Sequence, residues 1–393
     1  MSNASRLLRF GFLVLAFLFD ALPVAAQAST PWHWHVDGNV FAGVNYQYRK
    51  FTDFHALESQ NWIMASGQRP AAGGGLALTS MLSFEPFTLK KLGSPQVFQT
   101  GETYQGAPLV DYQHPHDLIT NLGLGYDHPL SSYRLSLGAY VVGSPALGPE
   151  PFMHRPSAAE NPQAPLSHHN LDSTHITPGV LNLGIFRNGI GVETSWFHGR
   201  EPDENRTDLD LGRLDSWSMR GTWNHGGWSA QASGGHLNSP ERNEPGRNLA
   251  RLTASVAHKT SGPIATTVLA AWGQNRGVHG LLDAYLFEST VSWLDSNYLY
   301  SRAELVTKDI LNAGGHDPAG FVDFHQLSRV GAYTLGYTHD LNKGMRTRLG
   351  LGGDVTMYYV PKNLKENYGG PVSIHIFLRF RFTSSDMMEG MHH

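Results

Sequence analysis

The chain has 393 residues and no cysteine, which excludes disulfide frameworks, thiol catalysis and cysteine-ligated zinc sites. Its formal net charge of −4 offers no basic surface of the kind that binds nucleic acid. Charged residues make up only 16% of the chain, against roughly 25% in ordinary soluble domains, and the 43 glycines and 11% aromatic residues argue further against a cytosolic enzyme.

The first segment of the chain has the three parts of a secretory signal peptide. Arg6 and Arg9 precede an apolar run from Phe10 to Phe19, and small residues follow around Ala26. The apolar run is too short to cross a bilayer as a helix, which takes about 20 residues. We therefore predict a signal peptide over 1–26 and export to the periplasm. The alternative is a membrane anchor that is retained.

Sixteen segments then alternate between apolar and polar residues, as strands with two different faces do. The last is the clearest, because apolar side chains occupy alternate positions from Val372 to Phe382, opposite Arg379 and Arg381. Most of the segments reach the length of about ten residues that a tilted strand needs to cross a membrane. We predict strands near 37–49, 58–69, 74–87, 118–127, 132–143, 174–186, 190–200, 213–224, 228–238, 248–258, 264–274, 281–294, 298–308, 327–339, 345–360 and 371–382.

The links between these segments alternate in length. Even-numbered strands end in turn formers such as Arg69-Pro70, His128-Pro129 and Asn188-Gly189, whereas most odd-numbered strands end in longer links such as 88–117 and 144–173. Short turns on one side and long loops on the other are typical of outer-membrane barrels. Such a sheet must close, because lipid offers no hydrogen-bond partner to an edge strand.

The predicted fold is therefore all-β: an antiparallel transmembrane β-barrel of about 16 strands, with 14 as the alternative count. It covers 27–382, with short periplasmic turns and long external loops, and a periplasmic tail follows over 383–393.

The chain resembles Gram-negative outer-membrane β-barrel proteins over about 27–382, with a last strand that ends in Phe382. Four segments are similar to an uncharacterised, porin-like group of these proteins, which brings no function with it. The resemblance implies an outer-membrane location, contact with outer-membrane lipid and lipopolysaccharide, and a homotrimer. The four segments are Gln99-Thr100-Gly101-Glu102, His114-Pro115-His116-Asp117, Met153-His154-Arg155-Pro156-Ser157 and Gly199-Arg200-Glu201-Pro202-Asp203-Glu204.

Histidine and aspartate residues are concentrated in the 88–117 and 144–173 loops. His114 and His116 stand two residues apart, so both rings point to the same side of an extended chain. Neutral imidazoles so placed can chelate Cu²⁺, Zn²⁺ or Ni²⁺. We predict that both loops fold into the lumen and share a metal site. The alternative is a plug in which these groups satisfy each other and Arg155. The predicted ligands are His114, His116, Asp117, His154, His168, His169, Asp172 and His175.

Two further segments carry candidate metal ligands. The tail has soft and borderline donors that suit copper, and the alternative is a tail without a site. The 201–212 loop has carboxylates that can hold Ca²⁺ against lipopolysaccharide at the outer rim, and the alternative is a solvated loop. The tail donors are Met387, Met388, Met391, His392 and His393, and the loop carboxylates are Glu201, Asp203, Glu204, Asp208 and Asp210.

Arginines recur on the polar face of the predicted strands, which should line the lumen. Arginine rings favour anions in a pore, so the pattern predicts a channel for small solutes or ions with a preference for anions. The alternative is internal ion pairing that braces the wall. The predicted lumen residues are Arg220, Arg251, Arg302, Arg346, Arg348, Arg379 and Arg381.

The runner-up function is a lipid or lipopolysaccharide hydrolase at the barrel rim. Such an enzyme needs a nucleophile beside a histidine base. Ser167-His168-His169 and Asp172-Ser173-Thr174-His175 contain the residue types, although the chain has no G-x-S-x-G elbow. A structural or adhesive barrel that binds through its external loops is a third possibility.

Overall fold

The computed structural model describes residues 31–50, 52–242, 244–311 and 326–384. The predicted signal peptide over 1–26 and the methionines and histidines of the predicted tail lie outside the described residues.

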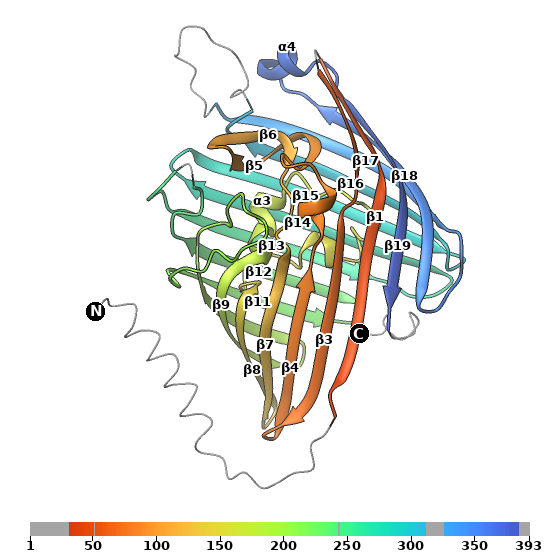
Figure 1. Ribbon diagram of the computed structural model, residues 1–393. Helices are drawn as coiled ribbons and strands as arrows, with labels where there is room; N and C mark the ends of the chain where they lie inside the picture. Colours follow the sequence, from red (N-terminus) through yellow and green to blue (C-terminus); the bar gives the residue numbers. More distant parts are fainter. Residues whose placement is uncertain (1–30, 51, 243, 312–325, 385–393) are drawn as a thin grey trace.

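Seventeen of the described strands form one antiparallel sheet that closes on itself (Figure 1). β1 (His33–Arg49) pairs along its length with β19 (Val372–Thr383), from Asp37 opposite Thr383 to Tyr48 opposite Val372. β2 (Thr52–Glu58) and β3 (Asn61–Ala71) pair with the two halves of β1, so together they act as one wall strand. The barrel therefore has 16 strands, which confirms the predicted fold and count.

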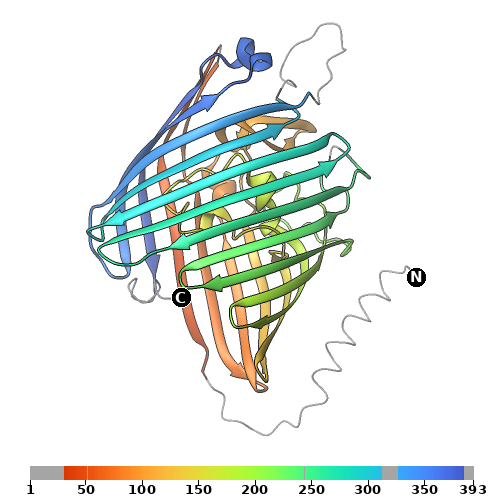
Figure 2. The ribbon, with the colours of Figure 1, turned by 180° about the vertical axis from the view of Figure 1, so that it is seen from behind.

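Each predicted strand corresponds to one wall strand. Two turns lie beyond their predicted positions, because Pro70 and Pro129 belong to the ends of β3 and β7 and the chain reverses after Ala71 and Leu130. The remaining wall strands are β4 (Gly74–Leu82), β7 (Ile119–Leu130), β8 (Tyr133–Gly143), β9 (Thr177–Arg187), β10 (Ile190–Phe197), β11 (Ser216–His225), β12 (Trp228–Leu237), β13 (Leu249–Lys259), β14 (Ile264–Gly277), β15 (Gly280–Trp293), β16 (Asn297–Lys308), β17 (Ser328–Asp340) and β18 (Thr347–Tyr359), several of which Figure 2 shows from behind.

The two faces of the wall differ as the alternation predicts. On β19 the side chain of Ile376 points outward and is 62% exposed, whereas Phe377 and Arg379 point inward and are buried. A strand exposes successive side chains on opposite faces, so one strand can present an apolar row outside and a charged row inside. None of the helices among the described residues is long and apolar enough to cross a membrane.

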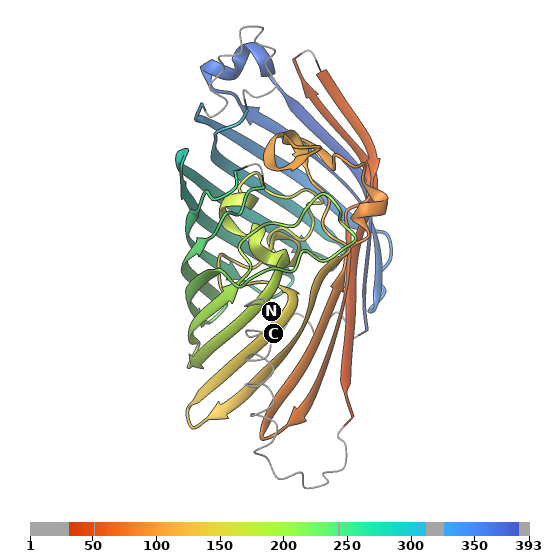
Figure 3. The same cartoon turned by 60° about the vertical axis from the view of Figure 1, so that its left-hand side comes forward.

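Two segments of the long-loop side fold into the barrel. The inner hairpin consists of β5 (Ser94–Tyr104) and β6 (Ala107–Gln113), which the sequence did not predict. The plug is the segment 144–176 between β8 and β9, and Figure 3 shows it between the two sides of the wall. The short helices are α2 (Glu85–Thr88), η1 (Phe152–His154), α3 (His168–Leu171), η2 (Ser173–Ile176), η3 (Lys362–Leu364) and α4 (Lys365–Tyr368).

Candidate functional site

Buried charges hold the plug against the wall. Arg155 of the plug donates through Nε to Glu288 Oε2 of β15 over 2.9 Å and also pairs with Asp172 of the plug. These three side chains are at most 2% exposed. Glu304 of β16 accepts from the backbone N–H and the hydroxyl of Ser167, over 2.9 and 2.8 Å. Because a buried charge is costly unless paired, these contacts specify one docked position of the plug.

Most of the predicted lumen arginines face inward and contact carboxylates. Arg220 pairs with Glu193, Arg302 with Glu288 and Arg348 with Asp340, over 2.9, 3.0 and 3.2 Å. Arg379 pairs with Glu160 of the plug and with Asp340, and Arg381 pairs with Glu160 over 2.9 Å. Arg251 donates to Asn275 and Ser173. Arg346 is exposed in the turn before β18. The arginines that contact carboxylates brace the wall and anchor the plug.

Five of the predicted ligand histidines lie in one cluster. The rings of His114 and His169 have centroids 5.7 Å apart, and those of His168 and His169 are separated by 5.3 Å. His175 continues the cluster, with its ring 5.2 Å from that of His168 and 5.4 Å from that of His116. Loops that are far apart in sequence therefore bring five imidazoles together.

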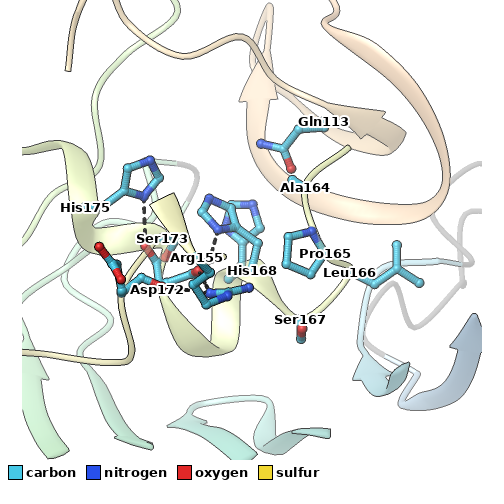
Figure 4. Close-up of polar contacts among 12 residues, drawn as sticks. Gln113, Arg155, Ala164, Pro165, Leu166, Ser167, His168, Asp172, Ser173 and His175 are labelled. Atoms are coloured by element: carbon cyan, nitrogen blue, oxygen red, sulfur yellow. Dashed lines mark hydrogen bonds and ion pairs between the residues drawn. The ribbon is translucent and has the colours of Figure 1, made fainter. Parts of the chain in front are cut away.

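Hydrogen bonds fix the tautomers of most of these rings. The Nδ1 atom of His116 lies 2.9 Å from Glu85 Oε2, and that of His168 lies 2.7 Å from Asp172 Oδ1. His175 Nδ1 donates to the Asp172 carbonyl oxygen over 2.8 Å (Figure 4). When Nδ1 carries the proton, Nε2 of a neutral imidazole carries a lone pair. Outer acceptors that orient imidazoles in this way also surround metal sites in proteins.

The five rings line one small cavity. Its volume is about 20 Å³, and His114, His116, His168, His169 and His175 line it together with Asp117, Glu102 and Glu201. The buried Nε2 atoms of three of the rings have no hydrogen-bond partner in the described part of the chain. Such unpaired acceptors call for a water molecule or a ligand. The three rings are those of His116, His169 and His175.

Burial controls the charge of the cluster. It places the pKa of His175 well below the usual range, and nearby His168 lowers it further. The pKa values of His114 and His169 are likewise well below the usual range, mainly through burial. Burial also lowers the pKa of His116, but the Glu85 carboxylate outweighs it and the net shift is upward. Most of the cluster is therefore neutral near pH 7, the state in which imidazole binds metals.

The other predicted ligands have different surroundings. His154 packs against Trp62, with ring centroids 4.7 Å apart, and its Nε2 lies 3.3 Å from the Met81 sulfur. Burial lowers the pKa of His154 to about 4. Asp117 lines the cavity and pairs with Arg206 over 3.3 Å. Asp172 does not line the cavity but orients His168 and His175 from behind.

The distances within the cluster bear on metal binding. A metal ion needs several donor atoms close together. Among the described residues, no three histidine, aspartate or glutamate side chains of the cluster have donor atoms that all lie within 4.8 Å of one another. A three-imidazole site therefore requires at least one ring to move toward the cavity. In the 201–212 loop, Asp203, Asp208 and Asp210 do meet this distance, but Arg242 already pairs with two of them.

Neither serine of the hydrolase prediction forms a hydrogen bond with a histidine of the described ranges. The Ser167 hydroxyl donates to Glu304, and the Ser173 hydroxyl accepts from Arg251 over 2.9 Å. Sequence reasoning missed Glu85, which lies just after β4, and Arg206, which pairs with Glu102 and Asp117. No local pattern marks either residue, because only the folded loops bring them to the histidines.

The comparisons with known proteins agree with the fold. No protein-family profile and no curated protein matches the sequence. An anion-selective porin from Comamonas acidovorans is similar in structure, with a TM-score of 0.52, 12% identity, and coverage of 90% of this chain and 100% of the porin. OmpF of Salmonella typhi, in complex with daunomycin, gives a TM-score of 0.56, 9% identity, and coverage of 89% of this chain and 97% of OmpF. The chain therefore has the fold of outer-membrane porins.

Proposed function

We propose that this protein is a pore-type outer-membrane barrel in which an internal plug carries a binding site for a divalent transition metal, such as Cu²⁺, Zn²⁺ or Ni²⁺. The observation that carries the proposal is the cavity lined by five histidines, because the buried Nε2 atoms of three of them have no hydrogen-bond partner among the described residues. A space lined by lone pairs attracts a cation, and imidazole is a ligand that suits all three ions.

The chain would bind the ion through His116 and His175, with a third imidazole rotated inward. Glu85 and the carbonyl oxygen of Asp172 interact with the Nδ1 sides of the first two rings, and the ion would take the place of the Nε2 proton that Glu85 favours on His116. Losing such outer partners typically lowers metal affinity about 10–100-fold. The ion would supply positive charge among neutral rings and carboxylates.

Metal titration of the detergent-solubilised protein tests this proposal. Wild type should retain Cu²⁺ after desalting, and the His116→Ala/His175→Ala variant should lose it. His258→Ala is a matched control, because His258 lies on β13 and packs against Trp228 with ring centroids 4.2 Å apart. Cu²⁺ retained equally by the wild type and the double variant, or by neither, would contradict the metal site.

The pore role is tested separately by conductance across a planar bilayer. The plug contacts inward-facing residues of β13, β15, β16 and β19, so we expect small currents from wild type and larger ones when the plug is released. Reversal potentials in asymmetric KCl would test the anion preference predicted from the arginines. The outer-membrane location, the contact with lipid and lipopolysaccharide, the homotrimer and the rim hydrolase stay predictions.

A further inference from the structure

The plug contacts the two sides of the barrel through different kinds of groups. Buried ion pairs fix it to β15 and β19. On the side of β1 and β3, Asn39 Nδ2 donates to the Ala159 carbonyl oxygen over 3.4 Å. Trp62 packs against His154, whose pKa of about 4, lowered by burial, leaves the ring neutral near pH 7. These contacts on the side of β1 and β3 join uncharged groups.

A cavity lies between the plug and this side of the wall, and we call it the amide cavity. Its volume is about 40 Å³, and its lining comes from β1, β3, the inner hairpin and the plug. A buried water needs about 10–15 Å³ of such volume, so the amide cavity has room for about three waters or for one molecule of three or four non-hydrogen atoms. Its lining includes the amide side chains of Asn39, Gln60, Asn61, Gln96 and Gln163.

Two of these amides have a carbonyl oxygen without a partner. Asn39 and Gln96 are each 5% exposed, and their Oδ1 and Oε1 atoms have no hydrogen-bond partner among the described residues. Their nitrogen ends are engaged, since Gln96 Nε2 donates to the Ala164 carbonyl oxygen over 2.8 Å and Asn39 Nδ2 donates to the plug as described. Because a buried acceptor without a donor is costly, the cavity calls for a molecule that donates hydrogen bonds.

Three further amides of the lining use their donors within the protein. Gln60 Nε2 donates to Glu58 Oε1 over 2.8 Å, and Asn61 Nδ2 donates to Thr88 Oγ1 over 3.0 Å. Gln163 Nε2 donates over 3.1 Å to a carbonyl oxygen of the inner hairpin. The amide cavity is therefore short of donors rather than of acceptors.

The remaining lining is mostly apolar and carries little net charge. Phe41 and Phe152 are buried and supply apolar surface. Among the described residues of the lining, Glu85 is the one carboxylate, it pairs with His116 over 2.9 Å, and no lysine or arginine is present. Apolar walls with a few placed polar groups are typical of sites for small molecules. An ion would gain little from such a lining, whereas an uncharged hydrogen-bond donor fits it.

We propose, beyond the metal site proposed above, that the amide cavity binds one small uncharged molecule with N–H donors, of the size of formamide or urea. Its N–H groups would donate to Asn39 Oδ1 and Gln96 Oε1, and its other atoms would lie against the apolar lining. The barrel would thus hold an uncharged solute beside the plug while the ion pairs keep the plug docked. His114 and His116 line both this cavity and the cavity of the five histidines, so the solute site and the metal site adjoin.

Two related solutes test the amide cavity. Formamide has two N–H donors, whereas N,N-dimethylformamide has none and is larger. Saturation-transfer difference NMR on the detergent-solubilised full chain should show transfer to formamide and not to N,N-dimethylformamide. Asn39→Leu/Gln96→Leu should weaken formamide binding about ten-fold or more, because two hydrogen bonds are lost. Equal transfer to both solutes, or no transfer to formamide in wild type, would overturn the proposal.

Matched variants locate the binding within the barrel. Ala158→Leu fills the amide cavity but leaves both acceptors in place, so it should also abolish formamide binding. Gln231→Leu removes an amide of β12 that donates to Thr253 over 3.0 Å, and it should retain formamide binding. Heat-modifiable electrophoretic mobility shows whether each barrel is folded. Formamide binding that survives both Asn39→Leu/Gln96→Leu and Ala158→Leu would overturn the amide cavity.

One further variant separates this site from the metal site. His175 lines the cavity of the five histidines but not the amide cavity. His175→Ala should therefore weaken Cu²⁺ binding and leave formamide binding unchanged. Formamide binding that depends on Asn39 and Gln96 in a protein that retains no Cu²⁺ would support the amide cavity and end the metal site.

Discussion

Replacing Arg155 by methionine tests whether buried charge holds the plug in place. Arg155 contacts both Glu288 and Asp172, and the variant leaves these two carboxylates buried without their shared cation. Removing one partner of a buried ion pair costs about 3–5 kcal/mol. Arg302 still pairs with Glu288 over 3.0 Å, so the cost of this variant should lie near the lower end of that range. This loss of free energy is larger than the roughly 1 kcal/mol that a single hydrogen bond typically contributes, so the plug should undock in a large fraction of molecules.

Two assays read the effect of Arg155→Met. Planar-bilayer conductance should rise as the plug leaves the lumen, and the midpoint of unfolding in urea should fall. Arg134→Met is the matched control, because Arg134 and Asp127 also meet at 2.9 Å but are 49% and 48% exposed. Exposed pairs contribute about 0–1 kcal/mol. The double variant Arg155→Met/Asp172→Asn removes the plug carboxylate that loses its cation, while Glu288 keeps Arg302 as its partner, and should recover part of the loss. If Arg155→Met behaves like Arg134→Met in both assays, buried charge does not hold the plug.

Three further substitutions examine the plug, the outer face and the lumen. Gly148 of the plug has a φ of +86°, and an added Cβ would overlap the Leu171 carbonyl oxygen, so Gly148→Ala should raise the conductance. Gly246 has a φ of +79° with open space around it, so the control Gly246→Ala should leave the conductance unchanged. Equal currents from the two variants would contradict this packing. Ile376→Arg puts a charge on the outer face of β19 and should lower the free energy of unfolding, measured in urea, by about 2–4 kcal/mol. The control Leu341→Arg, in the turn after β17, should lower it by at most about 1 kcal/mol. Equal losses would refute a row of side chains that faces lipid. His375→Phe removes the ring that contacts Asp354 over 2.5 Å and Asn45 over 2.8 Å. Because these buried polar groups then lack a partner, the free energy of unfolding should fall by about 1–3 kcal/mol. A stability equal to that of wild type would mean that this network is dispensable.

The wall could be predicted because its signal is local. In β19 the alternation between Val372 and Phe382 is a property of neighbouring residues, and it holds in the structure. The turns near Pro70 and Pro129 were predicted too early, because proline was interpreted as the turn itself. Each proline instead sits near the end of its strand, and the reversal uses residues such as Ala72 and Ser131, with φ values of +48° and +57°.

The interior could be predicted only in part. A contact between His114 and His116 and the histidines of the plug was predicted, because histidines are concentrated within each of the two loops, and the two groups do lie together. The inner hairpin was missed, because Phe98, Glu102 and Asp111 adopt positive φ and its pairing register shifts, which breaks the alternation of a regular strand. Glu241 comes close to Glu102 and Glu201 from a third loop, and no pattern within a single segment marks that meeting.

The anchoring of the plug has a consequence for how each copy is made. The partners of the plug come much later in the chain: Glu288 is 133 residues beyond Arg155, and Arg379 is 219 residues beyond Glu160. Contacts across such separations form slowly, because a long stretch of chain must be ordered first. The plug therefore reaches its full set of anchors only after β15, β16 and β19 are in place, so the docking of segment 144–176 is one of the last steps of folding.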